Sequence, residues 1–344
     1  MAKPKVNTME ELSLAIGVSR PTLSRYFQDP ASVRDSTVKK IQRGLEDVDY
    51  VPNFFATRLN RKSTGLIGVI IPHLNDLFFT SLLEVIQQSA RAQGYTVITQ
   101  SSHGDADLEQ HAAGKLMSMN ADGVIVAPLG EGSSARAFER LMTSMPLVFV
   151  DSHLPDALPG VPFVGTDNTQ SISLILDYLC QAGESPLFLG MPKLNSNAMD
   201  REAAYLAEME KRGLRSEIVP GSSQTAGWEF EAYAHDLMDE HFSNGRFRTG
   251  TLLCANDRLA IGALRAANRH RLFNRSGGLR IAGHDDHPLS RFMTPSLTTV
   301  KQQIDRIGEE AVSILAGLIS DGRPSLEAKE TRMFETTLRV RESA

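Results

Sequence analysis

From residue 66 onward, short apolar runs alternate with longer segments in which apolar residues recur at helical spacing. Leu82, Val85 and Ile86 are one such helical set. Strands that alternate with helices in this way form parallel sheets covered on both faces. The two series of runs predict two doubly wound α/β lobes. The expected strands are 66–72, 95–100, 122–128, 147–151, a run beginning near 163, 187–190, 215–219, 250–254 and 279–282.

The first fifty residues have a different pattern, which predicts three short helices. Residues 8–11, Thr-Met-Glu-Glu, form a capping box with Thr8 at the N-cap, and Gly17 ends this first helix. Ser19 begins a second helix with Pro21 in its first turn, where a missing N–H is tolerated. A third helix follows Asp35. Two short helices around a glycine turn, followed by a third, predict a helix-turn-helix unit.

In a helix-turn-helix unit, the N-terminal residues of the second helix contact base edges in the major groove. Arginine is well suited to a bidentate contact with guanine, and Arg20 and Arg25 lie on the second helix. The pattern alone is equally compatible with a helical bundle that has a solvated basic face. The expected base-reading and positioning residues are Thr8, Ser19, Arg20, Pro21, Thr22, Ser24 and Arg25.

Charge adds a weak signal in favour of a DNA contact, since many soluble domains have one charged end. The 344 residues have a formal net charge of −5, but residues 1–62 hold 11 basic and 7 acidic residues, so the remainder is strongly acidic. Only the basic head is therefore expected to approach a polyanion. No apolar run approaches the length of a membrane helix, residues 1–11 lack the apolar core of a signal peptide, and the two cysteines are far apart. We expect a cytoplasmic protein.

Four motifs in order along the chain resemble the LacI/GalR family of transcriptional regulators. Residues 17–25, Gly-Val-Ser-Arg-Pro-Thr-Leu-Ser-Arg, resemble its A-G-V-S-x-x-T-V-S-R signature, and residues 50–53, Tyr-Val-Pro-Asn, resemble its Y-x-P-N. Residues 66–69 resemble the I-G-V that opens its effector domain, and residues 338–343 resemble its C-terminal end. The resemblance covers essentially the whole chain.

The resemblance implies an N-terminal helix-turn-helix headpiece and a two-lobed body like that of periplasmic binding proteins, with two doubly wound parallel sheets. It implies a homodimeric repressor that binds pseudo-palindromic double-stranded operator DNA and is controlled allosterically by a small sugar-like effector. Because family tetramers carry a leucine heptad beyond this C-terminal motif, we expect a dimer. The expected parts are a DNA-binding domain at 1–49, a hinge at 50–64, and a body at 65–344, with one lobe at about 65–164 and 296–325 and the other at about 165–295 and 326–344.

Residues 53–62 are the expected hinge between the two parts. Asn53 is a good N-cap, but the segment is too short to be a stable helix alone. The family resemblance implies that paired hinges fold on the operator. Leu59 then stands at the position of a wedge that enters a base step, and Ala56 at the small position that permits close helix contact. The alternative is an ordinary linker.

Polar and aromatic residues follow several expected strands, where ligands bind in parallel sheets. Asn75-x-x-Phe78-Phe79 also resembles the N-x-F-F run of ribose-binding proteins, with Asp76 in place of the commoner Pro. In the second lobe, the family alignment leaves open whether Met199 or Arg201 faces the ligand. The expected effector-binding residues are Asn75, Phe78, Phe79, Asp151, Met199, Arg201, Asn256, Asp257 and Asp285.

Other chemistry has weaker support. Residues 284–287, His-Asp-Asp-His, could suit a divalent ion, but a ligand contact by Asp285 is the favoured interpretation. Residues 130–134 lack the lysine and spacing of a phosphate-binding loop, and no hydrolase motif occurs. We therefore expect no metal, no cofactor and no enzymatic activity. The main alternative function is a solute-binding protein of a sugar transport system, against which the basic head and the absence of a signal sequence argue.

Overall fold

The computed structural model describes most of the chain. The described residues are 3–53, 63–130, 133, 135–154, 157–158, 160–181, 183–192, 194–221, 227–273, 278–322 and 330–344. The predicted hinge residues Ala56 and Leu59 lie outside them. The chain divides between Gly65 and Leu66 into two compact units, called here the headpiece and the body. Among the described residues, no helix combines the length and apolarity needed to cross a membrane.

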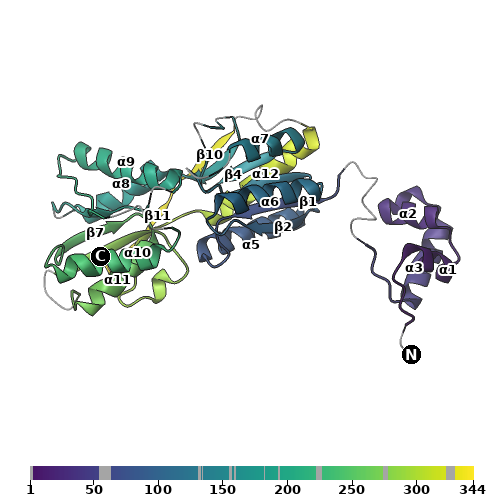
Figure 1. The fold of residues 1–344 in the computed structure, drawn as a ribbon, viewed down its shortest axis with the longest axis horizontal. Helices are drawn as coiled ribbons and strands as arrows, with labels where there is room; N and C mark the ends of the chain where they lie inside the picture. The colour runs from purple at the N-terminus through teal and green to yellow at the C-terminus, as the bar shows by residue number, and fades with distance from the viewer. Residues whose placement is uncertain are drawn as a thin grey trace. The chain divides into compact units, whose positions relative to one another are not determined.

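The headpiece has the predicted helix-turn-helix arrangement (Figure 1). Thr8 caps the first helix by accepting a hydrogen bond from the Glu11 backbone N at 3.1 Å. The Glu11 carboxylate returns to the backbone N of Asn7, at 2.8 Å, rather than to that of Thr8. Gly17 ends the helix with a φ of +66°, which glycine adopts without strain. The elements are α1 (Met9–Ile16), α2 (Arg20–Gln28), the 3₁₀ helix η1 (Pro30–Ser32) and α3 (Asp35–Asp47).

A small apolar core holds these helices together. Leu12 of α1, Leu23 of α2 and Ile41 of α3 are fully buried. Each comes from a different helix, so their shared burial fixes the orientation of α2 and leaves its other side in solvent.

The first lobe of the body, called here the N-lobe, contains a six-stranded sheet in the order β10-β5-β4-β3-β1-β2, with all neighbours parallel. Helices α5 and α12 pack together on one face, and α6 and α7 pack together on the other (Figure 1). The strands are β1 (Leu66–Ile71), β2 (Thr96–Ser101), β3 (Gly123–Val126), β4 (Leu147–Val150), β5 (Phe163–Thr166) and β10 (Thr331–Phe334). The helices are α5 (Leu77–Ala92), α6 (Ala106–Ser118), α7 (Ala135–Ser144) and α12 (Ile304–Asp321).

The second lobe, called here the C-lobe, contains a five-stranded sheet in the order β11-β9-β8-β7-β6. Only β11, at the edge, is antiparallel to its neighbour. Helix α8 packs on α9, and α10 packs on α11. The strands are β6 (Leu187–Leu189), β7 (Gly250–Cys254), β8 (Leu279–Asp285), β9 (Thr298–Lys301) and β11 (Thr337–Arg339). The helices are α8 (Asn168–Leu179), α9 (Ser196–Lys211), α10 (Phe230–Ser243), α11 (Asp257–Arg269) and the 3₁₀ helix η2 (Ser290–Phe292).

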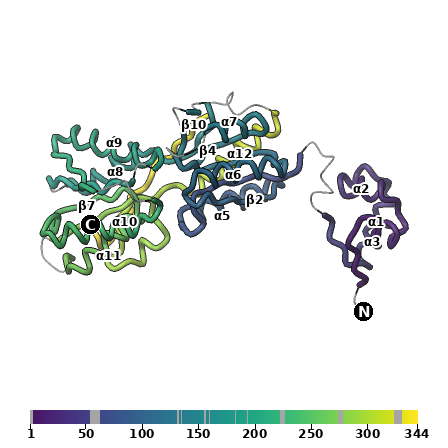
Figure 2. The backbone as a smooth tube through the Cα atoms, viewed as in Figure 1, coloured from purple at the N-terminus to yellow at the C-terminus, as the bar shows by residue number. Residues whose placement is uncertain are grey.

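The predicted α/β class and two doubly wound lobes are confirmed, but the expected lobe boundaries are not those observed. The expected division put 296–325 in the N-lobe and 326–344 in the C-lobe. In fact β9 pairs with β8 of the C-lobe, and β10 pairs with β5 of the N-lobe. The chain therefore crosses between the lobes three times, after β5, after β9 and after β10 (Figure 2). Strand pairing decides to which lobe β9 and β10 belong, and no local sequence pattern indicates that pairing. The expected strand at 215–219 is reduced to one isolated bridge at Ile218.

Candidate functional site

A small cavity lies between the two lobes of the body. It measures about 40 Å³ as the space open to the centre of a water molecule, so the lobes lie close together. Its walls come from the ends of strands and the first turns of helices in both lobes, as expected for doubly wound sheets. The lining residues are Asp76, Phe78, Phe79, Asp151, Met191, Asn195, Asn197, Arg201, Trp228, Phe230, Asn256, Arg258, Asp285 and Gln302.

Six of the nine expected effector-binding residues line this cavity, namely Phe78, Phe79, Asp151, Arg201, Asn256 and Asp285. Asn75 does not, because it is exposed and the adjacent Asp76 turns inward in its place.

Met199 and Asp257 also lie outside the cavity wall. Met199 is 52% exposed on α9, so of the two alternatives in this segment Arg201 is the one at the cavity. Asp257 is fully buried behind the wall, where it accepts hydrogen bonds from the His287 backbone N (2.7 Å) and from the hydroxyls of Ser290 and Thr299 (both 2.6 Å). Its contacts position the backbone around Asp285 rather than reach into the cavity.

Eight further lining residues were not among the expected ones: Asp76, Met191, Asn195, Asn197, Trp228, Phe230, Arg258 and Gln302. Two of them, Asp76 and Asn195, carried a usable signal, because each caps the helix that follows a strand. Asn195 caps α9 as Asn256 caps α11, each accepting from the backbone N three residues on. A polar cap that follows a strand therefore marks this edge of the sheet. The others are placed by contacts between distant segments.

Asp285 is the centre of one polar group, called here the Arg201 cluster. Its Oδ1 accepts three hydrogen bonds, from Arg201 Nη1 (3.2 Å), His284 Nδ1 (2.8 Å) and Gln302 Nε2 (2.7 Å). Burial raises the pKa of Asp285, but the Arg201 guanidinium and the His284 contact outweigh it and hold the pKa below its ordinary value. One carboxylate oxygen is thus saturated by the protein, and the other remains for a ligand.

The Arg201 guanidinium is fixed by hydrogen bonds at Nε and Nη1. Its Nε donates to Asn168 Oδ1 (2.9 Å), and its Nη1 donates to the Ala255 carbonyl (2.8 Å). No hydrogen bond joins its Nη2 to another described residue. The residue is 2% exposed, so this remaining nitrogen is a preorganised donor at the cavity wall.

Asp151 faces the same region from the N-lobe. It follows β4 with a φ of +63°, in the left-handed region that a non-glycine residue rarely adopts. Burial raises its pKa to about 7; Arg201 opposes that shift and Asp285 adds to it. Asp285 also has a positive φ, +124°. Two strained carboxylates that meet at one cavity indicate a functional constraint.

Arg258 organises a second polar group, called here the Arg258 cluster, which joins the lobes. Its Nε and Nη2 each contact the Glu231 carboxylate at 2.7 Å, and Nη2 also donates to the Trp228 carbonyl at 3.0 Å. Its Nη1 forms an ion pair with Asp76 Oδ2 of the N-lobe at 3.0 Å, with both side chains largely buried. Asp76 can do this while capping α5, since its other oxygen accepts from the Phe78 backbone N at 2.9 Å.

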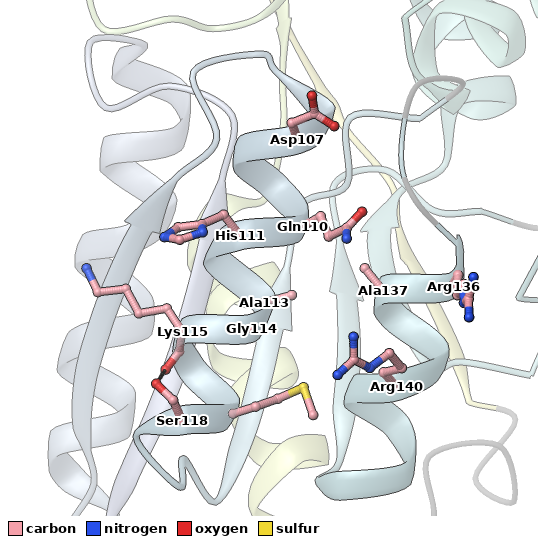
Figure 3. Close-up of a pocket in the computed structure, with 11 residues that line it drawn as sticks. Asp107, Gln110, His111, Ala113, Gly114, Lys115, Ser118, Arg136, Ala137 and Arg140 are labelled. Carbon is pink, nitrogen blue, oxygen red and sulfur yellow. Dashed lines mark hydrogen bonds between the residues drawn. The ribbon is translucent and has the colours of Figure 1, made fainter.

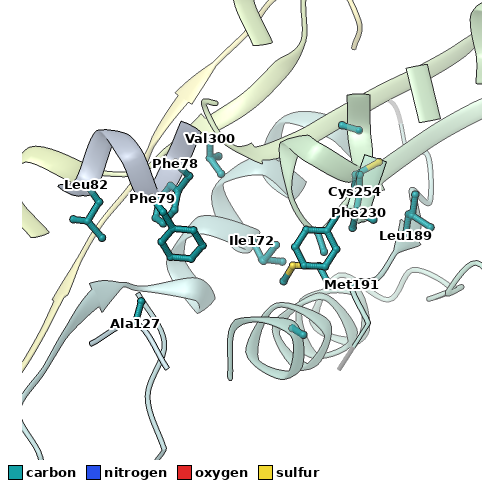
Figure 4. Packing of buried hydrophobic residues seen from close by; sticks show 14 of the residues in the cluster. Phe78, Phe79, Leu82, Ala127, Ile172, Leu189, Met191, Phe230, Cys254 and Val300 are labelled. Atoms are coloured by element: carbon teal, nitrogen blue, oxygen red, sulfur yellow. The ribbon is translucent and has the colours of Figure 1, made fainter. Parts of the chain in front are cut away.

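Aromatic rings from both lobes form the apolar part of the wall. Phe78 and Phe79 project from the first turn of α5 (Figure 4). The ring centroid of Phe79 lies 6.3 Å from that of Trp228, which lies 5.6 Å from that of Phe230. Trp228 is the chain's only tryptophan. Rings of this kind pack on the C–H faces of sugars, while carboxylates and amides bond the hydroxyls.

Two glycines let the lobes approach at the rim. A Cβ on Gly104 would lie 2.4 Å from Trp228 Cδ1, and one on Gly130 would lie 2.2 Å from the Leu194 carbonyl oxygen. Both residues have a positive φ. Gly130 therefore lies where the two lobes are in close contact.

A larger cavity, about 920 Å³, lies between α6 and α7 on the N-lobe (Figure 3). Its lining contains no Phe, Tyr or Trp, and its acidic and basic side chains do not converge. In Figure 3, His111 and Lys115 point to the side of α6 away from α7, while Arg140 points toward the gap. We do not assign the effector to it.

The metal-like segment at 284–287 is organised differently from a metal site. His284 is fully buried, with Nε2 against the Ser171 hydroxyl and Nδ1 against Asp285, both at 2.8 Å. Burial, followed by the nearby Arg201 charge, lowers the pKa of His284 to about 4, so the imidazole is neutral. Within the described residues, no group of three or more His, Cys, Asp or Glu side chains is arranged to hold a metal ion.

The headpiece presents most of its expected DNA-reading residues to solvent. Thr8, Ser19, Arg20, Pro21 and Arg25 are exposed, and Thr22 and Ser24 are half-buried. Ser19 and Thr22 share a hydroxyl–hydroxyl hydrogen bond of 2.8 Å.

Neither Arg20 nor Arg25 forms an ion pair with a described residue, so both guanidinium groups are available to a partner. Asn53 is exposed at the end of the described headpiece segment.

These features define a class: a helix-turn-helix unit joined to a two-lobed ligand-binding body. Comparison with protein families gives the same result. Residues 64–334 match the family described as periplasmic binding proteins and sugar binding domain of the LacI family, and residues 7–51 match a helix-turn-helix family. The chain belongs to the LacI family of DNA-binding transcriptional regulators.

Relatives match along most of the chain. The sucrose operon repressor of Lactococcus lactis subsp. lactis is 26% identical over 309 residues, which cover 89% of this chain and 92% of that protein. The ribose operon repressor of Escherichia coli (strain K12) is 26% identical over 95% of this chain and 96% of its own length. A crystal structure of the lac repressor dimer bound to operator and an anti-inducer has a TM-score of 0.82 with 23% identity, and the match covers 99% of each chain.

Proposed function

We propose that this protein is a dimeric transcriptional repressor whose affinity for operator DNA is set by a small sugar-like effector bound between the lobes. One observation carries the proposal: the chain that holds a cleft lined by rings, carboxylates and amides also holds a helix-turn-helix unit. On the second helix of that unit, Arg20 and Arg25 form no ion pair with a described residue. Relatives that match over nearly the whole chain are sugar operon repressors.

The headpiece reads DNA through α2. Arg20 and Arg25 contact bases in the major groove, and Thr8, Ser19, Pro21, Thr22 and Ser24 position the helix on the phosphates. Residues 1–49 form the DNA-binding domain and 50–64 the hinge, where Asn53, Ala56 and Leu59 contact the minor groove. A two-fold dimer requires a two-fold site, so the operator is pseudo-palindromic.

The cleft binds the effector between Phe79 and Trp228 on its apolar side and Asp151, Arg201 and Asp285 on its polar side. Phe78, Asn195, Asn197 and Asn256 complete the wall, and Asp257 lies behind it, where it accepts a hydrogen bond from the His287 backbone N. Asn75 and Met199 stay outside this set. Because the effector contacts both lobes, its binding changes the separation of the lobes. In the dimer, that change can alter the distance between the two headpieces.

The protein acts in the cytoplasm and carries out no catalysis, since its curated relatives are repressors and regulators rather than enzymes. A transport solute-binding protein shares the two-lobed body, but it has no use for a helix-turn-helix unit.

The test is the response of DNA binding to substitutions in α2. Arg20→Ala and Arg25→Ala should each cost about 1–3 kcal/mol on a pseudo-palindromic site selected from random DNA, with much smaller losses on unrelated DNA. Arg215→Ala, on an exposed arginine of the body, is the charge-matched control. If both headpiece variants keep full discrimination between selected and unrelated DNA, α2 is not the reading helix.

A further inference from the structure

Among the residues that the structure describes, carboxylates outnumber cations at the cleft. Five carboxylates stand in the wall or directly behind it, against two guanidinium groups, Arg201 and Arg258. The five are Asp76, Asp151, Glu231, Asp257 and Asp285. Neither arginine is without an acidic partner: Arg201 pairs with Asp285, and Arg258 pairs with Asp76 and Glu231.

We propose that the effector carries no negative charge: the cleft accepts uncharged or amine-bearing polyhydroxylated ligands and rejects sugar phosphates and sugar acids. The inference rests on the proposed function, which places the effector in this cleft, and it narrows the chemical class of that effector.

Arg258 cannot serve as an anion receptor. Four of its five N–H donors are engaged by Glu231, Asp76 and the Trp228 carbonyl, and its guanidinium lies 5.0 Å from the ring centroid of Phe230. An anionic ligand would have to displace Asp76 and open the contact between the lobes.

Arg201 Nη2 bonds to no residue that the structure describes, but the charge of the guanidinium is already shared with carboxylates. Asp285 pairs with it at 3.2 Å, and Asp151 lies near enough for the Arg201 charge to lower its pKa. A hydroxyl oxygen can accept a hydrogen bond from Nη2 without adding charge, whereas a phosphate or carboxylate would bring a further negative group beside two carboxylates.

The charge state of Asp151 determines the sign of the electrostatic potential in this part of the cleft. It is 7% exposed and forms no ion pair with a described residue. After burial, the charges of Asp285 and Asp76 help to raise its pKa to about 7, although Arg201 opposes them. The field that favours a proton on Asp151 also favours a hydroxyl or ammonium donor beside it, and repels an anion.

The test compares matched ligands on the full-length protein, with Trp228 fluorescence and thermal denaturation as readouts. The series are D-glucose, D-glucosamine, D-glucuronate and D-glucose 6-phosphate, the corresponding galactose set, and D-ribose with D-ribose 5-phosphate. In each series that binds, the uncharged or amine member should bind at least about 100-fold more tightly than the anionic members, because like charges placed together in a buried site are strongly unfavourable. Tighter binding of an anionic member overturns the inference.

Asp151→Asn tests the assigned cause. Asparagine keeps the size and a hydrogen-bonding oxygen but removes the charge, so discrimination against the anionic members should shrink by about tenfold. Asp105→Asn is the control for the chemical change: Asp105 lies outside the cleft, where it caps α6, and its substitution should leave discrimination unchanged. Equal discrimination by the Asp151→Asn variant and the parent protein removes Asp151 from the argument.

Operator titration of the same samples distinguishes failure of the charge inference from failure of the proposed function. An anionic sugar that binds and releases DNA overturns the charge inference and leaves the proposed function intact. Operator binding that responds to no sugar of any charge overturns the sugar-effector function, and this inference with it.

Discussion

The Arg201 and Arg258 clusters use the same side chain for different purposes. Both arginines start from C-lobe helices and are largely buried, and both pair with aspartate. Arg258 donates hydrogen bonds to Glu231, to the Trp228 carbonyl and to the N-lobe residue Asp76, and so joins the lobes. Arg201 pairs within its own lobe and keeps Nη2 for the cavity. The difference shows that donor saturation, rather than residue type, separates a structural arginine from one available to a ligand.

The N-lobe carboxylates differ in the same way. Asp76 caps α5 and pairs with Arg258, so both its oxygens have partners. Asp151 forms no ion pair with any residue that the structure describes. Burial raises the pKa of both, but only that of Asp151 is raised to about 7. The comparison therefore predicts separable effects in three experiments.

The largest effect is expected for Arg201→Met. Among the described residues, Arg201 is the one cation paired with buried Asp285, and an uncompensated buried charge typically costs about 3–5 kcal/mol. Urea unfolding followed by circular dichroism should show a loss of that size in the free energy of unfolding. Arg215→Met, where 84% of the arginine side chain is exposed, should cost less than about 0.5 kcal/mol. A loss below about 1 kcal/mol for Arg201→Met would mean that Asp285 has enough support from His284 and Gln302.

A smaller effect, with a distinct pH signature, is expected for Asp151→Asn. The unfolded chain releases the Asp151 proton near its ordinary pKa of 3.8, whereas the folded protein keeps it up to about 7. Asp151 therefore lowers the free energy of unfolding of the parent protein as the pH rises from 3.8 to about 7. Above both pKa values, this loss of stability is constant. Asparagine removes the penalty, so the variant should gain about 2 kcal/mol more over the parent at pH 8 than at pH 5. Thermal denaturation at both pH values measures it, and a gain that does not change with pH contradicts the assignment.

The smallest effect is expected for Asp76→Asn. Asparagine can still cap α5, and Arg258 keeps Glu231, so only the pair between the lobes is lost. A double-mutant cycle with Arg258→Gln should give a coupling of about 1 kcal/mol, and small-angle scattering should show a more open body.

Asp105→Asn controls for the helix cap, since Asp105 caps α6 without an ion pair. If the free-energy effects of Asp76→Asn and Arg258→Gln are additive and the scattering is unchanged, Asp76 and Arg258 do not hold the lobes together.

Much of the fold follows from the sequence because its causes are local. Apolar periodicity located strands β1 to β8, as at 66–71 and 250–254, but it did not predict β9, β10 or β11. Gly17 ended α1 and Thr8 capped it for reasons confined to one helical turn. The strand-end rule placed Phe79, Asp151, Asn256 and Asp285 at one cavity, because parallel strands share a carboxyl edge.

Tertiary structure alone decided how the lobes divide and which side chains meet. Strands β9 and β10 joined the opposite lobes from those expected, since a short strand pairs according to the free edges that the whole sheet offers. Arg201 faced the cavity and Met199 faced solvent because of the rotation of α9, which its packing fixes. Asp76 and Arg258 stand 182 residues apart in the chain. Their contact depends on how the two lobes pack against each other, a geometry that no local pattern of residues records.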